Sequence, residues 1–102
     1  MRQVIWSKPA SKELDQIVSY LAGENEYYAN LVGDRIDRAA ANLADFAIGR
    51  FGRVQDTYEL VVSRTPYILA YELTDTTVTI LHVVHGARDW QDGGWPDQDE
   101  LR

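Results

Sequence analysis

The stretch that decides the fold is YELVVSRTPYILAYELTDTTVTILHVVH, residues 58–85 of the 102-residue chain. Residues 58–62 alternate in side-chain character with a period of two, which is typical of a strand. The runs 67–73 and 78–85 are rich in β-branched and aromatic residues, and only short turns separate the three runs. Closely spaced strands joined by short turns pair as antiparallel hairpins. The segment therefore predicts a three-strand antiparallel meander.

Upstream of this meander, residues 8–23 predict an amphipathic helix. Ser7 offers a hydroxyl that can cap free amides. Pro9 lies in the first helical turn, where the N–H that proline lacks would have no partner within the helix. Apolar residues then recur at spacings of three and four, the pattern of one buried helical face: Leu14, Ile17, Val18 and Leu21. Gly23 fits the end of this helix.

A second helix is predicted from about residue 25 or 26 to Ala47. Its apolar stripe consists of Ala29, Val32, Ile36, Ala39, Ala40, Leu43 and Phe46, whereas Asp34, Arg35, Asp37 and Arg38 fall largely on the other side. Gly49 and Gly52 break the helix and begin a loop that holds Arg50 and Arg53.

A short strand over residues 3–6 precedes the helices, so the order is strand, helix, helix, strand, strand, strand. We expect an α+β domain in which two N-terminal helices pack on one face of a mostly antiparallel four-stranded sheet. This domain should span residues 1–90, and residues 91–102 should form an acidic tail. Four aromatic residues lie on the apolar faces of their elements and are expected in the core: Trp6, Phe46, Tyr67 and Tyr71.

Composition excludes several functional classes. The chain has no cysteine and a formal charge of −6, of which −4 falls within residues 89–102. An acidic chain is a poor candidate for unspecific nucleic-acid binding, although a local basic patch stays possible in the near-neutral body. No apolar run reaches the length of a membrane span, and the N-terminus has no signal-peptide pattern, so we expect a cytoplasmic protein without membrane contact.

The C-terminal half carries a family resemblance. The runs ELVV (59–62), TPYILAY (65–71) and VTILHVVHGARDW (78–90) look like the corresponding half of ParE-type toxins of the ParE/RelE superfamily, and the likeness extends over roughly residues 3–90. It implies the toxin of a type II toxin–antitoxin system, associated with growth inhibition and plasmid stabilisation. The partner implied is an antitoxin from the same operon, whose disordered C-terminal segment folds as it wraps the toxin. ParE members are associated with poisoning DNA gyrase, whereas RelE members cut messenger RNA on the ribosome without a metal.

The nuclease alternative needs an acid, a base and cations on the phosphate. The candidates are His82, His85, Arg64, Arg88, Tyr71 and Glu72. His82 and His85 differ by three positions on one strand, so they should point to opposite faces and cannot form an acid–base couple. Nuclease members often end in a tyrosine, but this chain has Trp90, which offers no titratable proton. No metal-ligand spacing is present, and no cofactor is expected.

The leading hypothesis is therefore a ParE-like toxin that acts on gyrase by protein contact, with an endoribonuclease acting on ribosome-bound mRNA as the alternative. An inactive member kept only as a binding module is a third possibility. The residues expected to contact the target or the antitoxin are Arg50, Arg53, Arg64, Arg88 and Trp90, because arginine pairs bidentately with carboxylates and phosphates. Solvated arginines and a salt-bridged strand end would explain the same residues without any function.

Overall fold

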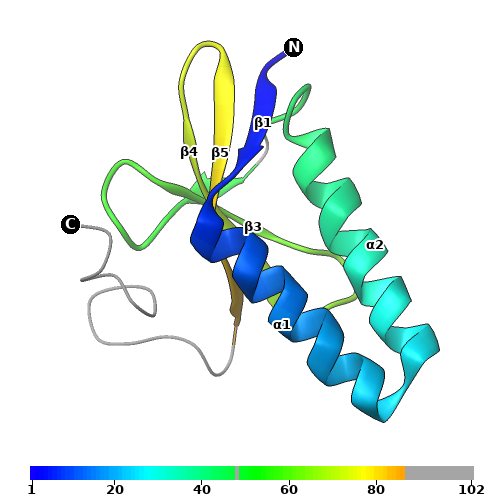
Figure 1. Cartoon of the computed structure of the whole chain (residues 1–102). Coiled ribbons are helices and arrows are strands. Elements are labelled where there is room, and N and C mark those ends of the chain that lie inside the picture. The colour runs from blue at the N-terminus through cyan, green and yellow to red at the C-terminus, as the bar shows by residue number, and fades with distance from the viewer. Residues whose placement is uncertain (48, 87–102) are drawn as a thin grey trace.

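In a computed structural model, which describes residues 1–47 and 49–86, the chain is an α+β fold with two helices on one face of a sheet (Figure 1). The elements are β1 (Gln3–Trp6), α1 (Lys8–Glu24), α2 (Glu26–Asn42), β2 (Arg50–Phe51), β3 (Tyr58–Val61), β4 (Tyr67–Leu73) and β5 (Thr77–His85). This confirms the predicted fold class and the meander of residues 58–85. The sheet has five strands rather than four, because Arg50 and Phe51 of the expected loop pair with β3.

The strand order is β1-β5-β4-β3-β2, and three of the four pairings are antiparallel. The exception is β1, which lies parallel to β5 with Gln3 opposite Thr77 and Trp6 opposite Ile80. The first strand of the chain is thus paired with the last one, and the α1–α2 hairpin lies on one face of the sheet (Figure 1). Most of the sheet is antiparallel, as predicted.

Polar side chains set the helix ends. The Ser7 hydroxyl accepts a hydrogen bond from the Ala10 amide at 3.2 Å and caps α1, as predicted. Extended Asn25, rather than Gly23, ends α1, and its side chain then caps α2 by accepting from the Tyr28 amide at 3.0 Å. One residue therefore both ends the first helix and starts the second.

The second helix ends at Asn42, five residues before the predicted end. The Leu43 and Ala44 amides bond the carbonyls three residues back, at Ala40 and Ala41, so the last turn tightens and the chain leaves the helix. Phe46 is consequently 66% exposed, and its predicted place in the core was wrong. Tyr67 and Tyr71 are buried as predicted, whereas Trp6 is half-buried against the core.

A β-bulge shifts the phase of β5. Ala70 lies opposite His82 but the next residue, Tyr71, lies opposite Ile80, so Leu81 is the extra residue. Before the bulge Val78 and Ile80 contribute to the core, and after it Val83 does. The bulge thus keeps apolar side chains of β5 under the helices although their spacing in the sequence changes.

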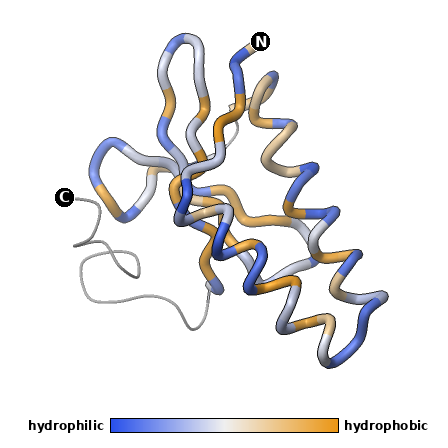
Figure 2. The backbone as a smooth tube through the Cα atoms, viewed as in Figure 1, coloured by the Kyte–Doolittle hydropathy of each residue, from blue (hydrophilic) through white to orange (hydrophobic). Residues whose placement is uncertain are grey.

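The core lies between the helices and the sheet, and hydrophobic and hydrophilic residues alternate along both helices (Figure 2). Its buried residues are Ala10, Val32, Ile36, Ala40, Leu43, Val62, Tyr67, Leu69, Tyr71, Val78, Ile80 and Val83. Within residues 1–47 and 49–86, neither helix has the length and apolar character that a membrane span requires.

Candidate functional site

A groove with a volume of about 280 Å³ separates the C-terminal half of α2 from β3. Its lining residues are Arg35, Arg38, Ala39, Asn42, Leu43, Phe46, Leu60, Val61, Val62 and Ser63. Leu43 and Val62 are buried, while Phe46 and Val61 are 66% and 52% exposed. Large apolar side chains that remain in solvent around a concave surface mark a site where another molecule binds.

Two arginines of α2 give this groove a positive rim. Arg35 and Arg38 are three residues apart, so they neighbour each other on the helix surface. The Arg35 guanidinium donates a hydrogen bond at 3.1 Å to the carbonyl oxygen of Arg64, which occupies the left-handed region at φ 64° in the β3–β4 turn. Among the described residues that line the groove, none carries a carboxylate. The groove therefore suits an apolar segment that also carries negative charge.

The loop from Gly49 to Thr57 is arranged around the buried carboxylate of Glu59. One oxygen accepts a hydrogen bond from the Arg53 amide at 2.8 Å, and the other lies 3.6 Å from the Arg50 guanidinium. Glu59 is only 2% exposed, whereas the Arg50 side chain is 61% exposed. The predicted contact residues Arg50 and Arg53 are thus brought together on one loop, and Arg64 lies at the opposite end of β3.

An aromatic stack crosses three strands beside that loop. Phe51 of β2, Tyr58 of β3 and Tyr71 of β4 lie directly opposite one another, with successive ring centroids 5.6 Å apart. The buried Tyr71 hydroxyl accepts a hydrogen bond from the Gly49 amide at 2.9 Å. The stack and this hydrogen bond hold the start of the loop against the core. Phe51 is the outermost ring of the stack.

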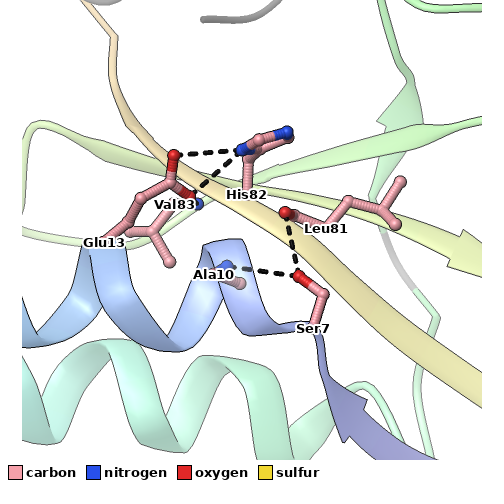
Figure 3. Close-up of polar contacts among 6 residues, drawn as sticks. All are labelled: Ser7, Ala10, Glu13, Leu81, His82 and Val83. Carbon is pink, nitrogen blue, oxygen red and sulfur yellow. Dashed lines mark hydrogen bonds and ion pairs between the residues drawn. The ribbon is translucent and has the colours of Figure 1, made fainter. Parts of the chain in front are cut away.

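The candidate histidines lie apart. His82 is opposite Ala70 and His85 is opposite Tyr67, so the rings occupy opposite faces of β5. His82 is 1% exposed, and its Nδ1 atom lies 3.0 Å from a carboxylate oxygen of Glu13 on α1 (Figure 3). The His85 ring meets the Tyr67 ring edge to face, with centroids 5.5 Å apart. These contacts give both rings a role in packing.

The other nuclease candidates do not join them in one site. Tyr71 is fully buried among the core residues, and Glu72 points to the face opposite Tyr71. Arg88 and Trp90 lie outside the described residues. In the ranges 1–47 and 49–86 no three His, Asp or Glu side chains are grouped to hold a metal ion.

Sequence reasoning missed the groove residues Arg35, Arg38, Phe46 and Val61. The two arginines were read as part of the solvent face of α2, and Phe46 as part of its buried stripe. The pattern within α2 contains no sign of β3, which forms the other wall. Glu13 was also missed, since nothing near it in the sequence indicates a partner 69 residues away.

Comparison with known proteins gives a consistent result. The family model of the ParE toxin of type II toxin–antitoxin system, parDE, matches residues 4–90. The chain is 36% identical over 90 residues to a Sinorhizobium fredii (strain NBRC 101917 / NGR234) protein named "Putative toxin Y4kP". The aligned region covers 87% of this chain and 93% of that protein. A solved structure described as "Chromosomal ParDE TA system from P. aeruginosa" has the same fold, with a TM-score of 0.76 over 83% of this chain and 96% of that chain at 21% identity.

Proposed function

Because the chain belongs to the ParE family of toxins of type II toxin–antitoxin systems, we propose that a cognate antitoxin neutralises it by binding the α2–β3 groove. We further propose that the unbound toxin acts in the cytoplasm and inhibits DNA gyrase by protein–protein contact. Arg50, Arg53, Arg64, Arg88 and Trp90 are the proposed contact residues for these partners.

The groove is the observation that carries the antitoxin proposal. Its lining is mostly apolar, and an amphipathic helix buries its apolar face in a groove of this kind. Arg35 and Arg38 on the rim would meet carboxylates of the same helix, and such pairs set orientation and exclude partners of the wrong charge. A segment that folds on binding gains the apolar contacts it cannot make alone.

Charge reversal on the rim tests this proposal. We expect Arg38→Glu to weaken binding of the antitoxin from the same operon by at least about tenfold, because an attractive pair becomes a repulsive one. Lys12→Glu on the exposed surface of α1 changes the net charge equally and should leave the affinity within about twofold. Equal affinities of the two variants, measured by calorimetry, would contradict binding in this groove.

Contact rather than catalysis is supported by the placement of the candidate groups. An acid–base pair must reach one reacting bond, but His82 and His85 lie on opposite faces and His82 is buried. A titration of purified toxin against gyrase should therefore reduce supercoiling, and a map of cellular mRNA should show no codon-positioned cuts after induction. Unaltered supercoiling together with mRNA cuts that disappear in Arg88→Ala would replace this proposal with the ribosome-dependent endoribonuclease.

A further inference from the structure

Phe51 is the most exposed aromatic side chain among residues 1–47 and 49–86, at 86%. It belongs to β2, a strand of only two residues at the edge of the sheet. A phenyl ring left in water forgoes the favourable free energy that burial would give a large apolar side chain. A ring held outward therefore needs an explanation in terms of binding or of local structure.

The ring is fixed rather than loose. It stacks on Tyr58 at 5.6 Å and an interplanar angle of 25°, and Tyr58 in turn stacks on buried Tyr71. The backbone on one side is tied by the Gly49 amide to Tyr71, and on the other by the Arg53 amide to Glu59. Phe51 lies between these two anchors.

Hydrogen bonds within the loop hold the rest of it together. The Gly52 amide donates to the Thr57 carbonyl at 2.8 Å, and the Thr57 hydroxyl donates to the Val54 carbonyl. A side chain at Gly52 would lie 2.5 Å from the Thr57 hydroxyl oxygen, so this close turn excludes one. The loop is thus ordered before any partner arrives, and binding through it would not incur the usual entropic cost of ordering.

We propose that the sheet edge at β2, with Phe51 on one face and the exposed Arg50 side chain on the other, forms a second binding surface, used for the protein that the toxin inhibits. The partner should offer an apolar pocket for the phenyl ring and a carboxylate that meets Arg50 across the strand edge. Aromatic residues and arginine are the types enriched at the energetic centres of protein interfaces. The Glu59 carboxylate that pairs with Arg50 is buried, whereas the Arg50 side chain is 61% exposed and can be reached by a partner. This inference rests on the proposed function, because it assigns a surface to the toxin's target.

The surface is distinct from the antitoxin groove. None of residues 49–57 lines the groove, to which β3 contributes through Leu60 and Val61 at its other end. A protein partner is favoured over a nucleic acid because the loop contains Asp56 as well as its two arginines, and the whole chain carries −6. Phosphate binding depends on a larger excess of cations than the net +1 of residues 49–57, where Asp56 offsets one of the two arginines.

The test compares Phe51→Ser with Tyr27→Ser in the full-length chain, with and without its antitoxin. Tyr27 is 76% exposed on α2, belongs to neither surface and serves as the matched control. Phe51→Ser should raise the toxin concentration for half-maximal inhibition of supercoiling by about thirty-fold, the effect of losing an interface hot spot of about 2 kcal/mol, and should relieve growth arrest. Its affinity for the antitoxin should stay within about twofold of the wild type. Tyr27→Ser should match the wild type in all three measurements.

Each other outcome overturns the proposal in a recognisable way. If the wild type arrests growth and Phe51→Ser arrests it equally, the surface is not used, although the proposed function stands. If Phe51→Ser loses antitoxin affinity instead, the loop belongs to the antitoxin interface. If the wild type binds a labelled single-stranded RNA and Phe51→Ser abolishes that binding, the partner is a nucleic acid. A wild type that never arrests growth removes the proposed function and this inference together.

Discussion

Glu13 and His82, which are 69 residues apart in the chain, meet where α1 passes the edge of β5. A carboxylate oxygen of Glu13 lies 3.0 Å from His82 Nδ1, and the other accepts a hydrogen bond from the Val83 amide at 3.1 Å (Figure 3). β1 pairs with β5 only as far as Ile80, and beyond it Ser7 donates from its hydroxyl to the Leu81 carbonyl. The start of α1 therefore takes over the sheet edge that β1 leaves uncovered.

This relationship predicts that Glu13 stabilises the fold. Glu13→Ala removes an acceptor shared by His82 and the Val83 amide, and an unsatisfied buried donor costs about 1–3 kcal/mol. Glu13→Gln keeps a carbonyl oxygen for the Val83 amide and should cost less. Gln16→Ala, an exposed position on the same helix, should change the free energy of unfolding by no more than about 0.5 kcal/mol. If urea titrations give Glu13→Ala and Gln16→Ala the same free energy of unfolding, the contact of Glu13 with His82 and Val83 does not stabilise the fold.

Replacing glycine by alanine should change the free energy of unfolding in opposite directions at two positions. A Cβ atom at Gly49 would lie 2.7 Å from the Glu59 carbonyl oxygen and against the Tyr71 hydroxyl, so Gly49→Ala should destabilise the fold by about 1–3 kcal/mol. Gly23 lies within α1 with no heavy atom within 4 Å of such a Cβ, and alanine there should stabilise the helix by about 0.5–1 kcal/mol. Thermal melts in which both variants shift in the same direction would contradict this account.

Much of the fold could be predicted because its strands and helices have clear local patterns. Ser7 marked the start of α1, and the period-two run from Tyr58 marked β3. The end of α2 could not be predicted in the same way, since Phe46 continues the apolar stripe after the helix has ended. The two-residue strand β2 was missed because two residues contain no period, and only the partner strand β3 defines it.

The candidate site was less predictable for a related reason. The groove has one wall on α2 and the other on β3, so neither Arg38 nor Val61 has a distinctive sequence context. Alternation along a strand did suffice to place His82 and His85 on opposite faces. A pattern within one element thus predicts which face a side chain occupies, whereas only the packing of two elements shows what it meets there.

Two carboxylates on the surface of α2 predict a stabilising substitution. Burial raises the pKa of Asp37 above its ordinary 3.8, and the negative charge of Asp34 raises it further. The stability that protonated Asp37 contributes is therefore full below about pH 3.8 and lost as the pH rises through the folded-state pKa. Asp37→Asn should exceed the wild type in unfolding free energy at pH 7, by about 0.2–0.5 kcal/mol at this solvent-screened position, and match it near pH 3. An equal gain from Asp75→Asn, in the β4–β5 turn, would mean that the effect is not local.

Tyr71 predicts a pH dependence at the alkaline end. Burial raises the pKa of its hydroxyl above 10.0, the hydrogen bond from the Gly49 amide lowers it, and Tyr58 raises it. Because the net shift is upward, the stability tied to neutral Tyr71 is complete below about pH 10 and is lost as the pH rises through the folded-state pKa. Tyr71→Phe removes the acceptor for Gly49 and should cost about 0.5–1.5 kcal/mol at pH 7. Phenylalanine cannot ionise, so this deficit should shrink above about pH 10, whereas Tyr27→Phe should follow the wild type throughout. A deficit that stays constant into the alkaline range would show that the Tyr71 hydroxyl does not control alkaline unfolding.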